Sequence, residues 1–167
     1  MRYVMKQKLW SLGNDFTVKD AAGRDRFFVD GKALSFGDQL SFQDMQGNEL
    51  AFIRQKLLSW GKTYEIHRGG RLFAVVKENW LPLTSYRFTV DVGADGPGPG
   101  DLEIRGNIFA HEYQFDRDGR RAAAVSMQWF SWADTYGVDV ADGEDDVLIL
   151  ACTVVVDMCT QKHKNNA

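Results

Sequence analysis

The chain alternates apolar and polar residues in short runs, and this alternation returns with a period of 24 residues. Pairs of apolar residues separated by one position begin at residues 16, 40, 64, 88 and 136, with one unit skipped before the last. A period of two places both members of a pair on one face of a half-buried strand. In the skipped unit the pair Tyr113 and Phe115 is displaced by one residue, a slip that a β-bulge would absorb.

Two kinds of turn follow the same period. An Asp-x-x-Gly sequence ends at Gly23, Gly47 and Gly119, where aspartate accepts hydrogen bonds and glycine adopts positive φ. Half a unit away, a turn with a large apolar residue, a serine and a glycine recurs. It occupies residues 10–13, 34–37 and 58–61, with a related segment at 130–133. Each unit therefore predicts two strands joined by short turns, as in an antiparallel meander.

The pattern predicts twelve strands before residue 141. They lie near residues 2–9, 14–20, 26–31, 39–44, 49–56, 62–68, 71–78, 85–92, 101–106, 111–116, 120–128 and 134–140.

The segment after the strands breaks the pattern. Residues 147–156 carry no charge, an acidic cluster precedes them, and Lys162, His163 and Lys164 follow. Negative charge suits the N-terminus of a helix and positive charge its C-terminus, which favours a helix over about 144–161. Five valines and isoleucines leave a long strand as the alternative. A helix that is apolar on every side must be buried, and this one is shorter than the roughly 20 apolar residues of a membrane span.

These elements define the expected fold class. We expect residues 1–167 to form one mainly β domain, a closed antiparallel twelve-stranded barrel around a central apolar C-terminal α-helix. A barrel of about 8 strands fills with its own side chains, whereas one of about 11 houses a helix. Closure also removes exposed sheet edges.

Composition narrows the possible partners. The chain has 20 basic and 23 acidic residues, a net charge of −3, and no broad basic field for nucleic acid. Lys6 and Lys8 interrupt the apolar N-terminus, so no signal-peptide core is expected. Cys152 and Cys159 would lie about 10 Å apart in one helix, too far for a disulfide. Reduced core thiols predict a cytoplasmic protein.

Catalytic and cofactor motifs are not found in the sequence. It contains no HExxH pair, no Cys–His cluster and no Gly-x-Ser-x-Gly elbow. The glycine-rich residues 93–100 lack the Lys-Ser or Lys-Thr pair of a phosphate loop. His111 and Glu112 would point to opposite faces of a strand, which argues against an acid–base pair. We therefore expect neither an enzyme nor a cofactor.

Two charged sets remain as candidate sites. Calcium candidates are the carboxylates Asp139, Asp142, Glu144 and Asp146, although their spacing does not fit an EF-hand and helix capping explains them without a metal. The candidates for contact with an anionic phospholipid or a protein partner are Lys6, Lys8, Arg54 and Lys56. Strand alternation places each pair on one face, but about 1 kcal/mol per basic residue predicts only weak, salt-sensitive lipid binding.

Aromatic residues recur in the serine-containing turns, which should gather at one end of the barrel. They are Trp10, Phe36, Trp60, Phe130 and Trp132. Such a ring either contacts a membrane or partner, or plugs the barrel end as part of the core. Because the aromatics follow the structural repeat, the plug is the favoured interpretation.

Several segments resemble a known family. They are 6–9, 55–59, 101–106, 111–113, 129–138 and 143–146, which read Lys-Gln-Lys-Leu, Gln-Lys-Leu-Leu-Ser, Asp-Leu-Glu-Ile-Arg-Gly, His-Glu-Tyr, Trp-Phe-Ser-Trp-Ala-Asp-Thr-Tyr-Gly-Val and Gly-Glu-Asp-Asp. Over essentially its whole length the chain is similar to the LURP-one-related family, and within it to bacterial members of the YxjI type. The family belongs to the tubby C-terminal-like superfamily, which implies a twelve-stranded barrel threaded by the C-terminal helix.

The resemblance implies less about function. The superfamily includes phosphoinositide-binding tubby domains and phospholipid scramblases, but the tubby basic pocket maps onto no particular residues here. The cysteine-rich palmitoylated stretch of the scramblases is absent from this sequence, whereas the acidic segment 139–146 lies where their calcium segment is proposed. The sequence therefore predicts a non-catalytic binding module of unknown ligand, and the alternative is a calcium-responsive, scramblase-like, membrane-associated protein.

Overall fold

In the part of the chain that the structure describes, the strands surround a single long helix. The computed structural model describes residues 1–6, 15–33, 37–81, 85–93, 100–129 and 135–166. Strand bounds are β1 Arg2–Lys6, β2 Phe16–Asp20, β3 Asp25–Ala33, β4 Asp38–Asp44, β5 Glu49–Lys56, β6 Thr63–Arg68, β7 Arg71–Leu81, β8 Ser85–Val92, β9 Leu102–Asn107, β10 Glu112–Arg117, β11 Arg120–Ser126 and β12 Thr135–Val140. A 3-10 turn, η1 (Ile108–Ala110), precedes β10, and helix α1 spans Asp146–Asn166.

The sheet is a closed antiparallel meander. Each strand pairs with its neighbours in sequence, and β1 closes the barrel by pairing with both β2 and β12. At the closure, the backbone N–H of Val140 donates to the carbonyl of Met1 at 2.8 Å. The sequence prediction of a closed twelve-stranded barrel is thus confirmed over the described residues.

The repeated apolar pairs line the interior. All twelve side chains at the paired positions are buried. They are Phe16, Val18, Leu40, Phe42, Tyr64, Ile66, Phe88, Val90, Tyr113, Phe115, Tyr136 and Val138. Because the alternation has a period of two, the residues between them face outward.

A β-bulge is part of the repeat. The pairing register shifts after Val18, Phe42 and Ile66, which are spaced by 24 residues, and again after Phe115. The bulge at Phe115 was expected to absorb the displacement of its unit. The same bulge occurs in units that are not displaced, so it instead belongs to the common unit, where it increases the local strand twist before the turn.

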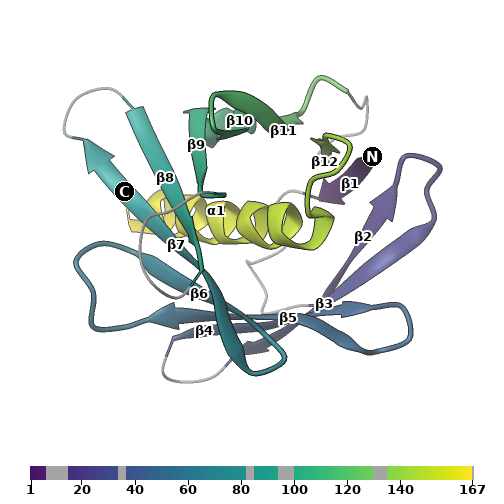
Figure 1. Ribbon diagram of the computed structural model, residues 1–167, viewed down its shortest axis with the longest axis horizontal. Coiled ribbons are helices and arrows are strands. Elements are labelled where there is room, and N and C mark those ends of the chain that lie inside the picture. Colours follow the sequence, from purple (N-terminus) through teal and green to yellow (C-terminus); the bar gives the residue numbers. More distant parts are fainter. Residues whose placement is uncertain (7–14, 34–36, 82–84, 94–99, 130–134, 167) are drawn as a thin grey trace.

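Helix α1 occupies the centre of the barrel, with strands on all sides of it (Figure 1). Every residue from Leu148 to Thr160 is buried, which explains why this segment is apolar on all faces. The Oδ1 of Asp145 accepts a hydrogen bond from the backbone N–H of Leu148 at 3.0 Å and so caps the first turn. The helix starts two residues later than expected and continues five residues further, to Asn166.

Candidate functional site

The two ends of the barrel differ in the elements that they expose. We call the end at which α1 begins the N-end and the end at which α1 finishes the C-end. Strands β1, β3, β5, β7, β9 and β11 end at the C-end, because consecutive antiparallel strands alternate in direction. The β5–β6 loop, which contains the serine-containing turn of residues 58–61, therefore lies at the C-end, whereas the turns at 10–13, 34–37 and 130–133 fall wholly or mostly outside the described residues.

Polar contacts fix the last turns of α1 at the C-end. The Nζ of Lys162 lies 2.6 Å from a carboxylate oxygen of Asp38 and donates to the Oε1 of Gln55 at 3.0 Å. The hydroxyl of Tyr64 also donates to Asp38, at 2.7 Å. Burial, together with the charge of Asp38, raises the pKa of Tyr64 well above its ordinary value, so this hydroxyl keeps its proton.

Two further contacts join α1 to the neighbouring strands. His163 lies 2.6 Å from the carboxylate of Glu78 on β7. The Nζ of Lys62 donates to the backbone carbonyl of Cys159 at 3.1 Å and so links the chain just before β6 to the helix. Asp38 and Glu78 thus both have partners on α1.

The β5–β6 loop is the most exposed apolar part of the described chain. Leu57 is 57% exposed, Leu58 96% and Trp60 103%. The plug interpretation is therefore wrong for Trp60, whose ring points into solvent. The other aromatics of this turn type, Trp10, Phe36, Phe130 and Trp132, lie outside the described residues.

The basic candidates lie on the outer face of the barrel near the C-end. Lys6 ends β1, Arg54 and Lys56 lie among the last residues of β5, and all three are exposed. Strands β2, β3 and β4 separate β1 from β5, so the two sets share one barrel end without forming one strip. The guanidinium of Arg54 is 2.5 Å from Glu65, whereas Lys8 lies outside the described residues.

The acidic candidates lie at the N-end and contact separate partners. Asp139 lies 3.5 Å from Arg2, and Glu144 lies 3.1 Å from Arg117. Asp146 accepts a hydrogen bond from the hydroxyl of Tyr3 at 2.5 Å. Three of the four calcium candidates thus already have partners in the protein. Asp142, the fourth, is exposed. Within the described part of the chain, no three His, Cys, Asp or Glu side chains are grouped to hold a metal ion.

The adjacent Asp145 forms a bidentate contact with Arg68. Both of its oxygens accept hydrogen bonds from the guanidinium of Arg68, at 2.7 and 2.8 Å. Burial alone would raise the pKa of Asp145, but the hydrogen bonds from Arg68 and from the backbone N–H of Leu148 outweigh it and lower the pKa. This carboxylate therefore helps to fix the start of α1.

A buried polar cluster, which the sequence reasoning missed, lies inside the barrel. His111, just after η1, lies 3.0 Å from Asp157 of α1, and the hydroxyl of Tyr136 donates to the other oxygen of this carboxylate. The rings of His111 and Tyr136 stack with centroids 4.6 Å apart. Glu112 points away and accepts from the hydroxyl of Ser126 at 2.8 Å, so His111 and Glu112 are not paired.

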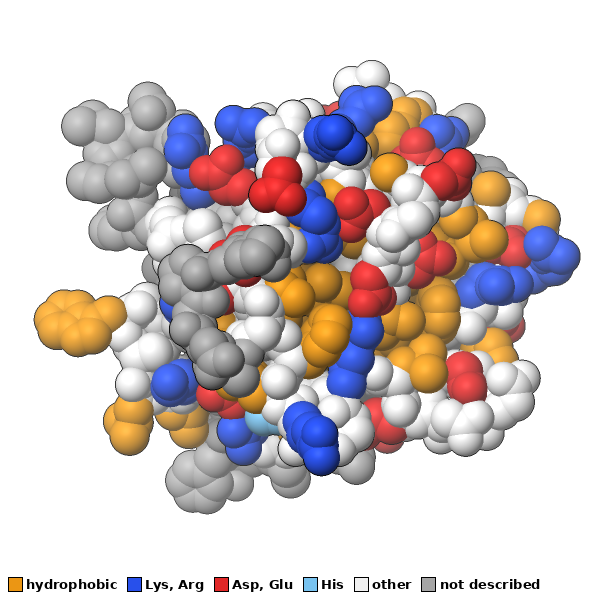
Figure 2. Space-filling model, viewed as in Figure 1, with side chains coloured by type: hydrophobic (Ala, Val, Ile, Leu, Met, Phe, Trp, Pro, Cys, Tyr) orange, Lys and Arg blue, Asp and Glu red, His pale blue; other side chains and the backbone are white. Residues whose placement is uncertain are grey.

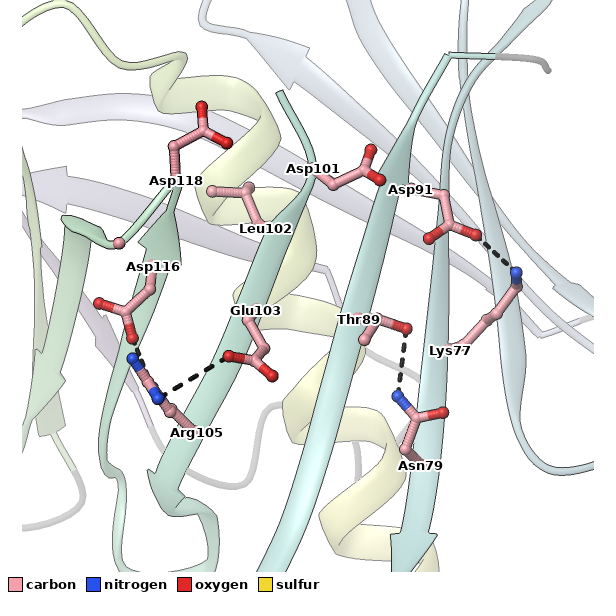
Figure 3. A pocket seen from close by; sticks show the side chains of 11 residues that line it. Lys77, Asn79, Thr89, Asp91, Asp101, Leu102, Glu103, Arg105, Asp116 and Asp118 are labelled. Carbon is pink, nitrogen blue, oxygen red and sulfur yellow. Dashed lines mark hydrogen bonds and ion pairs between the residues drawn. The ribbon is translucent and has the colours of Figure 1, made fainter. Parts of the chain in front are cut away.

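A hollow of about 550 Å³ lies on the outer face of β7 to β10 (Figure 3). Its basic groups contact its acids: Lys77 lies 2.5 Å from Asp91, and Arg105 lies 2.7 Å from Asp116. The surrounding carboxylates outnumber these two cations. They are Asp91, Asp101, Glu103, Asp116 and Asp118. Such a surface repels anionic ligands.

Comparison with known proteins agrees with this architecture. A closed antiparallel barrel threaded by its C-terminal helix also occurs in a crystal structure of a protein from Arabidopsis thaliana, with a TM-score of 0.71, 15% identity and coverage of 95% of this chain and 90% of that one. The sequence model of the LURP-one-related family matches residues 1–157 of this chain. The chain belongs to this family.

A bacterial relative is more similar in sequence. The chain is 32% identical over 154 residues to the uncharacterised protein YxjI of Bacillus subtilis strain 168, an alignment that covers 92% of this chain and 90% of that protein. The resemblance inferred from the sequence is thereby confirmed. Among the described residues, no helix has the length and apolarity needed to cross a membrane.

Proposed function

We propose that this barrel is a non-catalytic binding module that contacts its partner through the C-end. The observation that carries the proposal is the β5–β6 loop, in which Leu58 and Trp60 are almost fully exposed. Contiguous exposed apolar side chains of this size are typical of interaction surfaces. The basic residues Lys6 and Lys56 lie at the same end and favour an anionic partner.

The interior of the barrel supports a non-catalytic function. Helix α1 fills the centre with buried side chains from Leu148 to Thr160, where a ligand-binding barrel would hold its substrate. The His111–Asp157 pair has groups suited to acid–base chemistry, but both side chains are buried behind the barrel wall. Two buried free cysteines, Cys152 and Cys159, fit a reducing, cytoplasmic environment.

Parallel capture from phospholipid arrays and from cell lysate tests the proposal. We expect ligands of the wild-type protein to be lost by Leu58→Ser combined with Trp60→Ser, and to be retained by Met45→Ser. Met45 is a matched control because it is an exposed apolar residue in the β4–β5 turn at the opposite end of the barrel. If the loop variant retained the same ligands as the wild type, the C-end would not be the contact surface.

The basic candidates are tested by the salt dependence of binding. Replacing Lys6, Lys8, Arg54 and Lys56 with Gln should weaken binding and flatten its dependence on ionic strength, since charges near an anionic surface are screened by salt. An unchanged salt dependence would exclude these four residues from the contact.

A further inference from the structure

The β5–β6 loop has a defined conformation although its apolar side chains are uncovered. The hydroxyl of Ser59 donates within the loop and lies 3.1 Å from the carbonyl oxygens of both Lys56 and Gly61. At the end of the loop, the backbone N–H of Glu78 donates to the carbonyl of Lys62 at 2.9 Å. These polar contacts stabilise the turn, so Leu58 and Trp60 are free to project outward instead of joining the core.

Neighbouring turns support the same surface. A Cβ placed on Gly37, at the end of the β3–β4 turn, would lie 3.0 Å from the Cδ2 of Leu57. Leu57 therefore rests against the adjacent turn, while Leu58 and Trp60 extend beyond it. Figure 2 shows hydrophobic side chains standing out on the left of the molecule, the side on which α1 finishes in Figure 1.

Four lysines lie at the same end of the barrel as this apolar projection. Lys56 and Lys62 flank the loop, while Lys6 and Lys164 lie at the same end of the barrel. Lys6, Lys56 and Lys164 form no ion pair with any described residue, whereas the nearby acids Asp38 and Glu78 already contact Lys162 and His163. Lys6, Lys56 and Lys164 are therefore available to contact an anionic surface, although the chain as a whole has a net charge of −3.

We infer that the β5–β6 loop inserts Leu58 and Trp60 into the interface of an anionic lipid bilayer, an inference that rests on the proposed C-end contact. A fluid bilayer accepts protruding side chains without a complementary pocket, which a protein partner would have to supply. Trp and Leu at the depth of the headgroups, with lysines reaching the phosphates around them, are the composition of an interfacial anchor. Because the lysines are dispersed, binding should follow the surface charge density and not one headgroup.

Insertion is measured with an environment-sensitive fluorophore on the thiol of Leu58→Cys. The two native cysteines are buried in the barrel, and burial raises the pKa of both thiols, so the introduced thiol reacts first. We expect a blue shift with vesicles of phosphatidylcholine containing about 30% phosphatidylserine, and a much smaller shift with phosphatidylcholine alone. A matched label on Met45→Cys, at the N-end, should not shift.

Vesicle sedimentation then measures the contribution of the loop. Leu58→Ser combined with Trp60→Ser should lower the partition coefficient roughly tenfold or more, since binding scales with the buried apolar area, while Met45→Ser should leave it unchanged. Both residues are exposed, so thermal unfolding of the variants should match that of the wild type.

The outcomes separate this inference from the proposed function. Absence of a fluorescence shift, or equal sedimentation of the loop variant and the wild type, overturns membrane insertion. If the loop variant also loses a captured protein ligand, the C-end contact stands and only the lipid assignment fails. If neither vesicles nor captured ligands respond to the loop variant, both proposals fail.

Discussion

Inside the barrel, the imidazole of His111 lies 3.0 Å from the carboxylate of Asp157, and their side chains are only 2% and 4% exposed. His111 occupies the left-handed region, with φ of 53°, where it follows η1. This conformation is uncommon for residues other than glycine, although asparagine, aspartate and histidine adopt it more often than most, and here it accompanies an imidazole that faces the helix. Asp157 thereby joins α1 to the β9–β10 connection and, through Tyr136, to β12.

Replacing Asp157 should strongly destabilise the protein. Asp157→Ala leaves the buried His111 and Tyr136 groups without their acceptor, and breaking such a pair costs roughly 3–5 kcal/mol. Asp157→Asn keeps one acceptor and should cost less. Urea unfolding measures both, with the exposed Asp142→Ala as the control that should change stability by less than about 0.5 kcal/mol. A loss below about 1 kcal/mol in Asp157→Ala would show that the cluster contributes little to stability.

Removing α1 should abolish the native state. Each larger buried side chain of the helix contributes about 1.5–3 kcal/mol as an upper figure, while the whole domain is stable by only about 5–15 kcal/mol. A chain ending at Gly143 should therefore be insoluble or molten. A sharp, dispersed NMR spectrum from that chain would show that the strands fold without the helix.

The strands could be predicted from the sequence because their side chains alternate between the core and solvent. The residues between the buried pairs are polar at most positions, so the 24-residue repeat and the number of strands follow from local pattern. The buried helix was predictable because an acidic cluster precedes its uncharged run and basic residues follow it, and because a segment that is apolar on every side must be buried.

The contacts that depend on how α1 is rotated about its own axis inside the barrel could not be predicted. Asp157 follows the uncharged run directly, and a lone acid among buried helix residues was the available signal for an interior polar partner. Its partner His111 lies 46 residues earlier, on the far side of two β-hairpin connections. The orientation of the Trp60 side chain could not be predicted either. The repeat predicts that the residue lies in a turn, but not whether its ring points into the barrel or into solvent.

Stability should decrease in acid because of Asp145. The contacts with Arg68 lower the folded-state pKa of this carboxyl below its unfolded value of about 3.9. A lowered pKa stabilises the folded state above the unfolded pKa, and this contribution is lost as the pH falls through the folded pKa. Comparing the melting temperature at neutral pH and near pH 3 should show a smaller decrease for Asp145→Asn than for the wild type.

Arg68→Gln provides an independent check of that pH dependence. It removes the bidentate partner while leaving the Asp145 cap on Leu148 in place, so the acid sensitivity should also decrease. If both variants kept the full acid sensitivity of the wild type, other carboxyls would be responsible. Asp116, whose pKa is also lowered by hydrogen bonds from Gln114 and Arg105 against the effect of burial, would then be the next residue to test.

Calcium should leave the thermal stability of the protein unchanged. The carboxylates near the start of α1 already have partners, since Glu144 contacts Arg117, Asp146 contacts Tyr3 and Asp145 caps the helix. Calcium requires about 6–8 oxygens around one point, and drawing these side chains together would break contacts that hold the helix in place.

The measurement is the melting temperature with and without millimolar calcium. A ligand present at about 100 times its dissociation constant stabilises the folded state by about 2.7 kcal/mol, which would raise the melting temperature by several degrees. A shift of that size, abolished when Asp142→Asn and Asp146→Asn are combined, would establish a calcium site at the N-end. Magnesium is the matched control, because its smaller, octahedral coordination should not reproduce a shift that depends on a flexible carboxylate cluster.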